Sequence, residues 1–293
     1  MKTALISSVC FWSFLLMCSI PGAFGQDTPT DSTLYRIETH NGNVFIGRLV
    51  TENDQQMVLK TTDIGEITIQ RSDIKKAEII SPEQVIDGRY WFKNPHSTRY
   101  FFSTNARPLG TGNGYYQNTW VLFNNINVGI SENISLGGGI VPTFLFGSVG
   151  TPVWFLPKVS IPIQNDNVYL SAGAMLGGII GEENSGLGLL YSVGTIGSDD
   201  TNFSLGLGFG YTGDDWSNSP VINASIMHRT GRTFYLITEN YLIPVDGTYQ
   251  GLLSAGVRWA PENFAVDFAL ARPTEAGDFI GIPWLGVTLP FGN

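Results

Sequence analysis

Histidine, a frequent general base in hydrolytic sites, is scarce in this chain of 293 residues. Of His40, His96 and His228, only His228 has a serine nearby that suits a site in the C-terminal part of the chain, namely Ser225. A base beside a nucleophile would suit a membrane-embedded hydrolase or acyltransferase. The sequence RTGR follows His228 directly, which is more typical of a surface histidine at a turn. We therefore predict no catalytic residue and no enzyme, with His228 and Ser225 as a weak alternative.

The sequence also argues against a resident metal or cofactor. Three scattered histidines do not make a zinc site by themselves. The acidic stretches GEENSG and GDDWSNS lack the regular alternation of oxygen ligands found in a calcium loop. Glycine-rich runs such as GLGFG precede no predicted helix, so they do not form a phosphate cradle. We predict no metal and no cofactor.

Four charged residues lie within otherwise apolar or small-residue segments: Lys158, Glu239, Arg258 and Asp267. Charged side chains at membrane depth face the protein interior and pair there. Arg258 and Asp267 lie almost symmetrically about the turn PEN, which predicts a cross-strand ion pair. The four charges would either line a pore that selects charged solutes or form a salt-bridged plug that stiffens a narrow barrel. Equal numbers of acidic and basic groups favour the plug.

The first 25 residues have the order of a secretory signal peptide. Lys2 precedes an apolar stretch from Ala4 to Ile20, a proline follows, and a small-residue site predicts cleavage before Gln26. The alternatives are an uncleaved anchor or a lipoprotein modified at Cys18. Cleavage would remove both cysteines, which excludes thiol chemistry and disulfides from the mature chain. The formal net charge of −9 argues against a nucleic-acid partner.

Long strands with two-residue alternation dominate the chain from residue 98 onward. In the clearest run, FSLGLGFGY, large apolar residues alternate with serine and glycine from Phe203 to Tyr211. Segments of about ten residues with this alternation are typical of transmembrane barrel strands. Long and short connections alternate through most of the region, which predicts about twelve strands in the manner of such barrels. The first would lie near Tyr100–Ala106 and the last near Phe279–Phe291.

Residues 34–81 have a different pattern, with five short alternating strands and a tight turn at Asn41 and Gly42. This pattern resembles small SH3-like or Sm-like barrels. The RNA binding common among Sm-like proteins is not carried over, because this segment lacks a basic face. The predicted core of the segment is Val44, Ile46, Leu49, Val58, Leu59, Ile64, Ile67, Ile69, Ile74 and Ile79.

Residues 82–97 are predicted to link the two parts of the chain. Ser81, Pro82 and Gln84 fit a capped helical turn that ends at Gly88. The following aromatic cluster, YWF at 90–92, has basic flanks and is typical of a membrane interface, although an ordinary buried aromatic patch has the same composition.

The region from about residue 90 to 293, with its closing strand WLGVTLPF, resembles the outer-membrane β-barrel proteins of Gram-negative bacteria. It departs from them at the end, where Phe291 is followed by Gly292 and Asn293. Five prolines also fall in predicted strands, and we expect Pro142 and Pro157 to share one bulge or kink.

The expected architecture is all-β, an antiparallel transmembrane β-barrel of about twelve strands (98–293) preceded by a small SH3-like or Sm-like domain (34–81). A signal peptide (1–25), a flexible stretch (26–33) and the linker complete the chain. The leading hypothesis is an outer-membrane protein, porin-like, with a narrow channel or a structural and interaction role. Its partners would be outer-membrane lipid, together with a periplasmic protein or peptidoglycan through residues 34–81. The alternatives are a soluble secreted β protein that binds a hydrophobic ligand and the membrane-embedded enzyme.

Overall fold

The structure, a computed structural model, describes residues 33–147, 150–164, 167–182, 185–213 and 215–292. The predicted signal peptide and nearly all of the predicted flexible stretch lie outside the described residues. The chain divides into two compact units, one that extends to Tyr90 and one that begins at Trp91. Within the described residues, no helix has the length and apolar composition to cross a membrane.

The first unit is a five-stranded antiparallel sheet with the strand order β4-β3-β2-β1-β5. A 3₁₀ helix, η1 (Arg71–Asp73), joins β4 to β5. The strands are β1 (Leu34–Thr39), β2 (Val44–Glu52), β3 (Gln56–Thr61), β4 (Gly65–Gln70) and β5 (Ile74–Ile80). The core consists of Ile37, Met57, Leu59 and Ile69, with Phe45, Leu49 and Ile67 among the residues packed against it.

The predicted core of this unit is partly wrong. Val44, Ile64 and Ile79 are exposed, whereas the neighbouring Ile80 is buried. Side chains on a strand alternate between its faces, so only one residue of the pair Ile79–Ile80 can point inward. The choice is set by the pairing of β5 with β1, in which Leu34 lies opposite Ile80.

Ion pairs along β1 and β5 lower the pKa of two carboxyl groups of this unit. Lys75 donates a hydrogen bond to Glu38 and is the main reason that the pKa of Glu38 lies below its ordinary value. Burial raises the pKa of Glu78, but Lys76 and Arg36 outweigh it and lower this pKa. Both carboxylates therefore favour the folded sheet in their ionised form.

The predicted capped turn is confirmed, but it is shorter than expected. The 3₁₀ helix η2 (Pro82–Gln84) has the capping box that Ser81 and Gln84 predict. A short hairpin of β6 (Val85–Ile86) and β7 (Arg89–Tyr90) follows. Gly88, with φ of +71°, serves the hairpin turn and does not end a helix.

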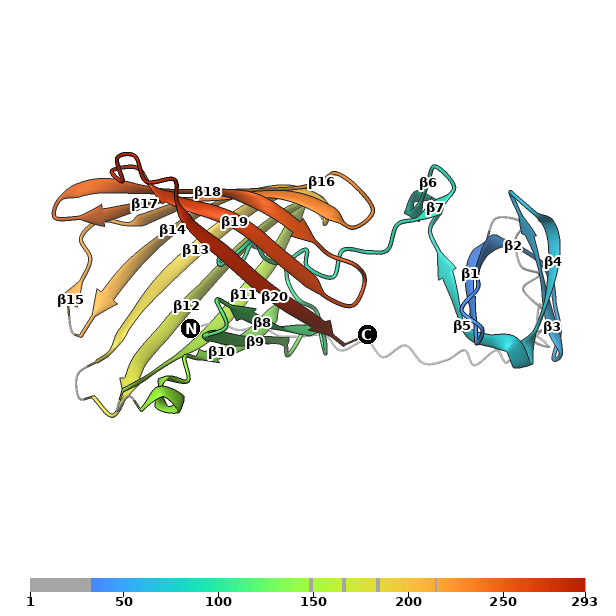
Figure 1. The fold of residues 1–293 in the computed structure, drawn as a ribbon, viewed down its shortest axis with the longest axis horizontal. Coiled ribbons are helices and arrows are strands. Elements are labelled where there is room, and N and C mark those ends of the chain that lie inside the picture. The colour runs from blue at the N-terminus through green and yellow to red at the C-terminus, as the bar shows by residue number, and fades with distance from the viewer. Residues whose placement is uncertain (1–32, 148–149, 165–166, 183–184, 214, 293) are drawn as a thin grey trace, which may run out of the picture. The chain divides into compact units, whose positions relative to one another are not determined.

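The second unit is a closed antiparallel barrel of twelve strands, as predicted (Figure 1). Each strand pairs with the next along the chain, and β20 pairs with β8 to close the ring. The strands are β8 (Gly114–Thr119), β9 (Phe123–Gly129), β10 (Ile134–Ile140), β11 (Thr151–Gln164), β12 (Val168–Ile180), β13 (Leu187–Gly197), β14 (Thr201–Thr212), β16 (Val221–Arg229), β17 (Phe234–Val245), β18 (Thr248–Trp259), β19 (Ala265–Pro273) and β20 (Ile282–Phe291). A two-residue strand, β15 (Asp215–Trp216), extends the edge of β14.

The predicted first strand is wrong. Tyr100–Ala106 belongs to no named strand, and the barrel begins at β8. A single bridge between Arg99 and Thr104 is the only strand-like pairing in this part of the described chain. The count of twelve nevertheless holds, because β8 and β9 are two short strands in a region that the predicted connections left as one strand.

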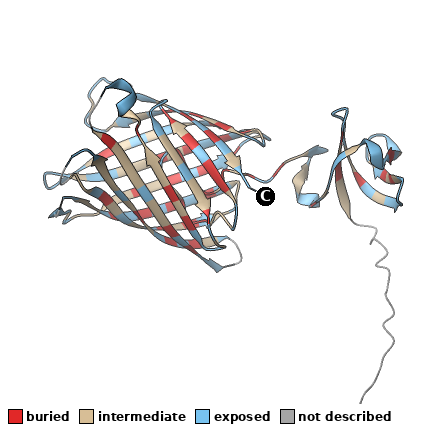
Figure 2. Cartoon of the chain, turned by 90° about the horizontal axis from the view of Figure 1, so that it is seen from below, coloured by how far each residue is buried: buried red, intermediate tan, exposed pale blue. Residues whose placement is uncertain are grey.

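The outer face of the barrel is apolar. Along β14, Phe203, Leu205 and Leu207 are exposed, while the intervening residues, which include Ser204 and Gly206, are buried. Figure 2 shows a similar alternation of exposed and buried residues along the barrel strands that face the viewer. Large apolar side chains therefore point away from the barrel, and small or polar side chains point into it.

The expected bulge shared by two prolines is wrong. Pro142 lies beyond the end of β10, where it precedes the 3₁₀ helix η3 (Thr143–Phe146). Pro157 lies inside β11 and pairs with Leu136 of β10 without a register shift. The ladder between β11 and β12 has no pairing for Leu156 and Pro157, and it continues in the same register on either side of them.

Candidate functional site

The beginning of the second unit, ahead of β8, fills part of the barrel lumen. We call residues 94–107 the plug segment. Most of it is buried, including His96, Arg99 and Asn105. It folds back on itself in a turn, where the amide of Tyr100 donates to the carbonyl of Ser103 at 2.9 Å. The expected boundary between linker and barrel at residue 98 therefore falls inside one continuous interior segment.

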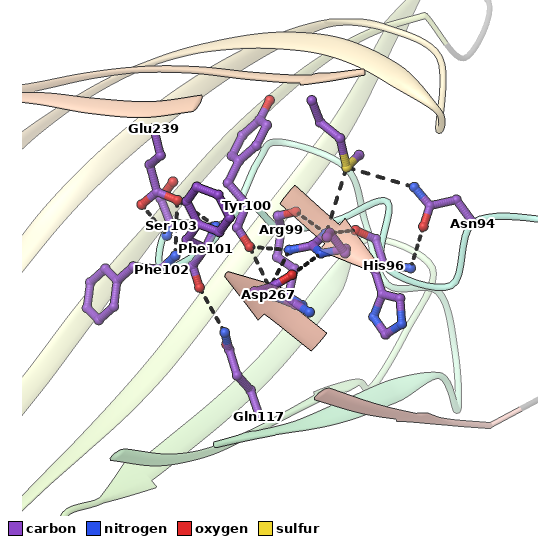
Figure 3. A network of polar contacts seen from close by, with 12 residues as sticks. Asn94, His96, Arg99, Tyr100, Phe101, Phe102, Ser103, Gln117, Glu239 and Asp267 are labelled. Carbon is purple, nitrogen blue, oxygen red and sulfur yellow. Dashed lines mark hydrogen bonds and ion pairs between the residues drawn. The ribbon is translucent and has the colours of Figure 1, made fainter. Parts of the chain in front are cut away.

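Glu239, on β17, holds the tip of the plug segment (Figure 3). Its carboxylate accepts hydrogen bonds from the backbone amides of Phe101, Phe102 and Ser103, at 2.6, 3.0 and 2.9 Å. Consecutive amides that point in one direction bind an anion well. The carboxylate, which is 2 % exposed, has its charge compensated by the turn and by the hydroxyl of Tyr241.

A buried charge cluster contacts Arg99 and Tyr100 of the plug segment. Arg258 on β18 donates to Asp267 on β19 at 2.6 Å, so the predicted cross-strand pair forms. Arg99 of the plug segment binds the second oxygen of Asp267 at 2.8 Å. Arg258 also donates to the carbonyl of Tyr100 at 2.5 Å. One carboxylate is thus shared by two guanidinium groups, and one of these belongs to the plug.

Lys158 on β11 binds the part of the plug segment that follows the turn. Its ammonium group donates to the hydroxyl of Thr104 at 2.7 Å and to the carbonyls of Asn105 and Arg107 at 3.1 and 2.9 Å. An ammonium group has three donors, and all three are used. Arg107 in turn pairs with Asp199, in the connection between β13 and β14, at 2.6 Å.

All four predicted lumen charges, Lys158, Glu239, Arg258 and Asp267, therefore point inward, and all four contact the plug segment. They come from four strands, β11, β17, β18 and β19. In this arrangement all four bind groups of the protein itself. The geometry matches the salt-bridged plug, with the addition of a chain segment that carries its own charges.

Sequence reasoning missed Arg99 and Arg107, because it placed the residues between them, Tyr100–Ala106, in a wall strand. A signal was present: Pro95 and Pro108 flank this segment, and proline is unsuited to the inside of a closed sheet. The sequence between them, HSTRYFFSTNAR, also lacks a long two-residue alternation.

The aromatic cluster at 90–92 is divided between the two units. Phe92 is buried, and its carbonyl accepts a hydrogen bond at 3.0 Å from Arg229 at the end of β16. The Arg229 guanidinium also lies 4.9 Å from the ring centre of Trp91 and pairs with Asp200. Trp91 and Phe92 thus fit the buried aromatic patch better than a membrane-interface anchor.

The weak catalytic alternative is not assembled. His228 and Ser225 are three residues apart on β16, so their side chains lie on opposite faces of the strand. His228 is exposed and contacts Thr201 at 3.0 Å, whereas the buried Ser225 donates to Asn223 at 3.2 Å. Among the described residues, no group of three or more His, Cys, Asp or Glu side chains is arranged to hold a metal ion.

Beyond the plug tip, the lumen contains a cavity of about 270 Å³. It extends from Phe102 and Ser103 to Trp120, in the connection between β8 and β9. Most of the side chains around it are aromatic or aliphatic, and the polar ones are largely amides and hydroxyls.

Comparisons with known proteins give fold-level similarities only. No protein family matches the sequence, and no curated protein matches it. The solved structure of KdgM porin in complex with disordered oligogalacturonate is 8% identical, with a TM-score of 0.45, and the match covers 62% of this chain and 98% of that chain. The OmpT loop L8 deletion mutant, an outer membrane protein of Vibrio cholerae, is 10% identical, with a TM-score of 0.33, over 88% of this chain and 96% of that chain. Similarity at this level is no guide to what this chain binds or transports.

Proposed function

We propose that this chain is a porin-like outer-membrane β-barrel protein with a narrow lumen, which the plug segment obstructs in the arrangement described above. The observation that carries the proposal is the distribution of polarity. The closed barrel exposes large apolar side chains around its outside, whereas the wall charges Lys158, Glu239, Arg258 and Asp267 are buried inside and contact the plug segment. This distribution suits a wall that faces lipid.

The outward apolar face weighs against the soluble alternative. A soluble barrel or sandwich hides its apolar face and presents a polar face to water. Here Leu205 and Phe268 are exposed, while Ser204 and Asp267 are fully buried. An apolar surface that continues around a barrel wall would cause a soluble protein to aggregate.

The predicted signal peptide supports export, and the even number of strands supports a periplasmic position for both barrel termini. We infer that residues 34–81 of the first unit form a small barrel of the SH3-like or Sm-like type. Its strand order and the 3₁₀ helix between β4 and β5 support that assignment. A periplasmic protein or peptidoglycan would be its partner.

Membrane fractionation and heat-modifiable migration on a gel test the location. We expect the protein in the outer-membrane fraction, folded in detergent and shifted in migration after boiling. A mature protein that stays soluble and monomeric without detergent would contradict the proposal.

Planar-bilayer recording of a variant that lacks residues 94–107 tests the channel. We expect little current from the intact chain and a clear increase from the variant, provided that the variant keeps heat-modifiable migration. A correctly folded variant without current would favour a structural role.

A further inference from the structure

We infer that the lumen cavity beyond the plug tip is a binding site for a small, neutral, planar aromatic molecule that carries one hydrogen-bond acceptor. The inference uses the barrel fold and the position of the plug. It does not require that the barrel conducts, so the two proposals can fail separately.

The first observation is an unusual phenylalanine. Phe102 lies at the plug tip, inside the barrel, yet its side chain is 65 % exposed. Its backbone amide is held by Glu239, which fixes the turn, and the ring points away from the polar network (Figure 3). The protein thus presents a large apolar group to the cavity instead of packing it.

The second observation is a continuous series of aromatic rings along one wall. Phe102 lies edge-on to Trp284, with 6.4 Å between the ring centres, and Trp284 lies 4.9 Å from Trp120. Phe123 lies 5.9 Å from Trp120 and 6.3 Å from Trp154. These spacings lie in the range in which aromatic rings attract one another, so a further planar ring can join the series.

Another part of the lining is aliphatic, and it includes Met175, Leu189 and Val193. The aromatic and aliphatic part of the lining favours an apolar ligand, as engineered apolar cavities that bind benzene show. At about 270 Å³, the cavity is slightly smaller than the roughly 300–1,000 Å³ of sites for drug-sized ligands. It therefore suits a molecule of one or two rings.

The charge of the cavity lining argues against an ionic ligand. The only ordinarily charged side chain among the described lining residues is Lys158, and its three donors are used by the plug segment. An anion or a cation would lose its hydration here without gaining a free counter-charge. The ligand is therefore neutral.

Some buried donors of the lining residues have no partner within the protein. Among the described residues these include Trp284 Nε1 and Asn127 Nδ2. Leaving a buried donor without a partner costs free energy, which a hydroxyl or carbonyl oxygen of the ligand would recover.

The test uses a fluorinated 2-naphthol, which is neutral at pH 7, and the matching fluorinated 2-naphthoate, which is an anion. Both are titrated by ¹⁹F NMR into the full chain in lipid nanodiscs, with empty nanodiscs as the reference. We expect saturable binding of the naphthol and at least tenfold weaker binding of the naphthoate.

The variants are Trp284→Leu, Trp154→Leu and Phe102→Ala, each checked for heat-modifiable migration. Each loses one ring of the series, and we expect naphthol affinity to fall by about five- to tenfold. Phe102→Ala keeps the backbone amides that bind Glu239, so it removes a ring without removing the turn. The matched control is Trp259→Leu, because Trp259 lies on the outward face of β18 and contacts Phe264. Affinity should not change in this control.

Three results would overturn the inference. One is uptake of the naphthol that does not saturate and equals that of empty nanodiscs. Another is binding of the naphthoate as tight as that of the naphthol. The last is an equal loss of affinity in Trp259→Leu and in folded Trp284→Leu.

Discussion

Replacement of Glu239 by glutamine should loosen the plug without removing any of its residues. The Glu239 carboxylate accepts three backbone hydrogen bonds from the plug tip. Hydrogen bonds to a charged group contribute about 1.5–3 kcal/mol, compared with about 0.5–1.5 kcal/mol for neutral ones. A glutamine keeps one carbonyl oxygen and introduces an NH₂ group that cannot accept a hydrogen bond. At least one tip amide therefore loses its acceptor.

The expected destabilisation of the tip is about 3 kcal/mol, which allows for relaxation and for a water molecule at the orphaned amide. A change of this size increases the population of a displaced tip by roughly 150-fold. The assay is planar-bilayer recording, in which E239Q should show openings that are rare in the intact chain. The matched control is E262Q, because Glu262 is exposed in the connection between β18 and β19.

A reversible lock makes this test sharper. The amide of Ala106 lies 2.8 Å from the hydroxyl of Thr195 on β13, so the paired substitutions A106C and T195C would join the plug to the wall. In E239Q with this lock, openings should fall when the disulfide forms and return on reduction. Our reasoning about the plug would be refuted if folded E239Q opened no more often than E262Q. It would also be refuted if the frequency of openings did not change when the disulfide of the lock formed.

Three further predictions follow from the described contacts. D267N should lower the temperature at which the protein shifts in heat-modifiable migration by more than R258M does. The loss of Asp267 leaves two buried guanidinium groups uncompensated, and the loss of a buried charged partner costs about 3–5 kcal/mol. The first unit should become less stable as the pH falls below about 4. The fold lowers the pKa of the Glu78 carboxyl group, so its ionised form stabilises the unit above the unfolded pKa of about 4.3. This stabilisation is lost as the pH falls through the folded pKa. Hydrogen exchange of the first-unit sheet in the full chain measures that loss, and a flat pH profile would contradict it. H228A should leave the lipid profile of the cells unchanged, and any altered lipid species would revive the enzyme alternative.

The barrel could be predicted because its two-residue alternation is repeated many times. A single strand such as β14 is ambiguous between a sandwich and a membrane barrel, but the even strand count and loop pattern reduced that ambiguity. The ion pair between Arg258 and Asp267 was equally accessible, since a short turn fixes which residues of two neighbouring strands lie opposite each other.

The plug could not be predicted in the same way, because its contacts join residues far apart in the sequence. Phe101 and Glu239 are 138 residues apart, and Arg99 and Asp267 are 168 residues apart. No local pattern fixes such pairs. The predicted core of the first unit is partly wrong for a different reason, since Ile79 and Ile80 are equally apolar and only the pairing of β5 with β1 decides which one is buried.

The distribution of the four wall charges explains why one substitution should loosen the plug and not release it. Glu239 holds only the tip, whereas Asp267 and Arg258 hold residues before the turn and Lys158 holds residues after it. Complete withdrawal must break these contacts together, and each break exposes a buried charge without a partner. E239Q should therefore give brief openings of small conductance, and deletion of residues 94–107 should give a larger, sustained current. Equal conductance from the two variants would mean that the tip alone closes the lumen.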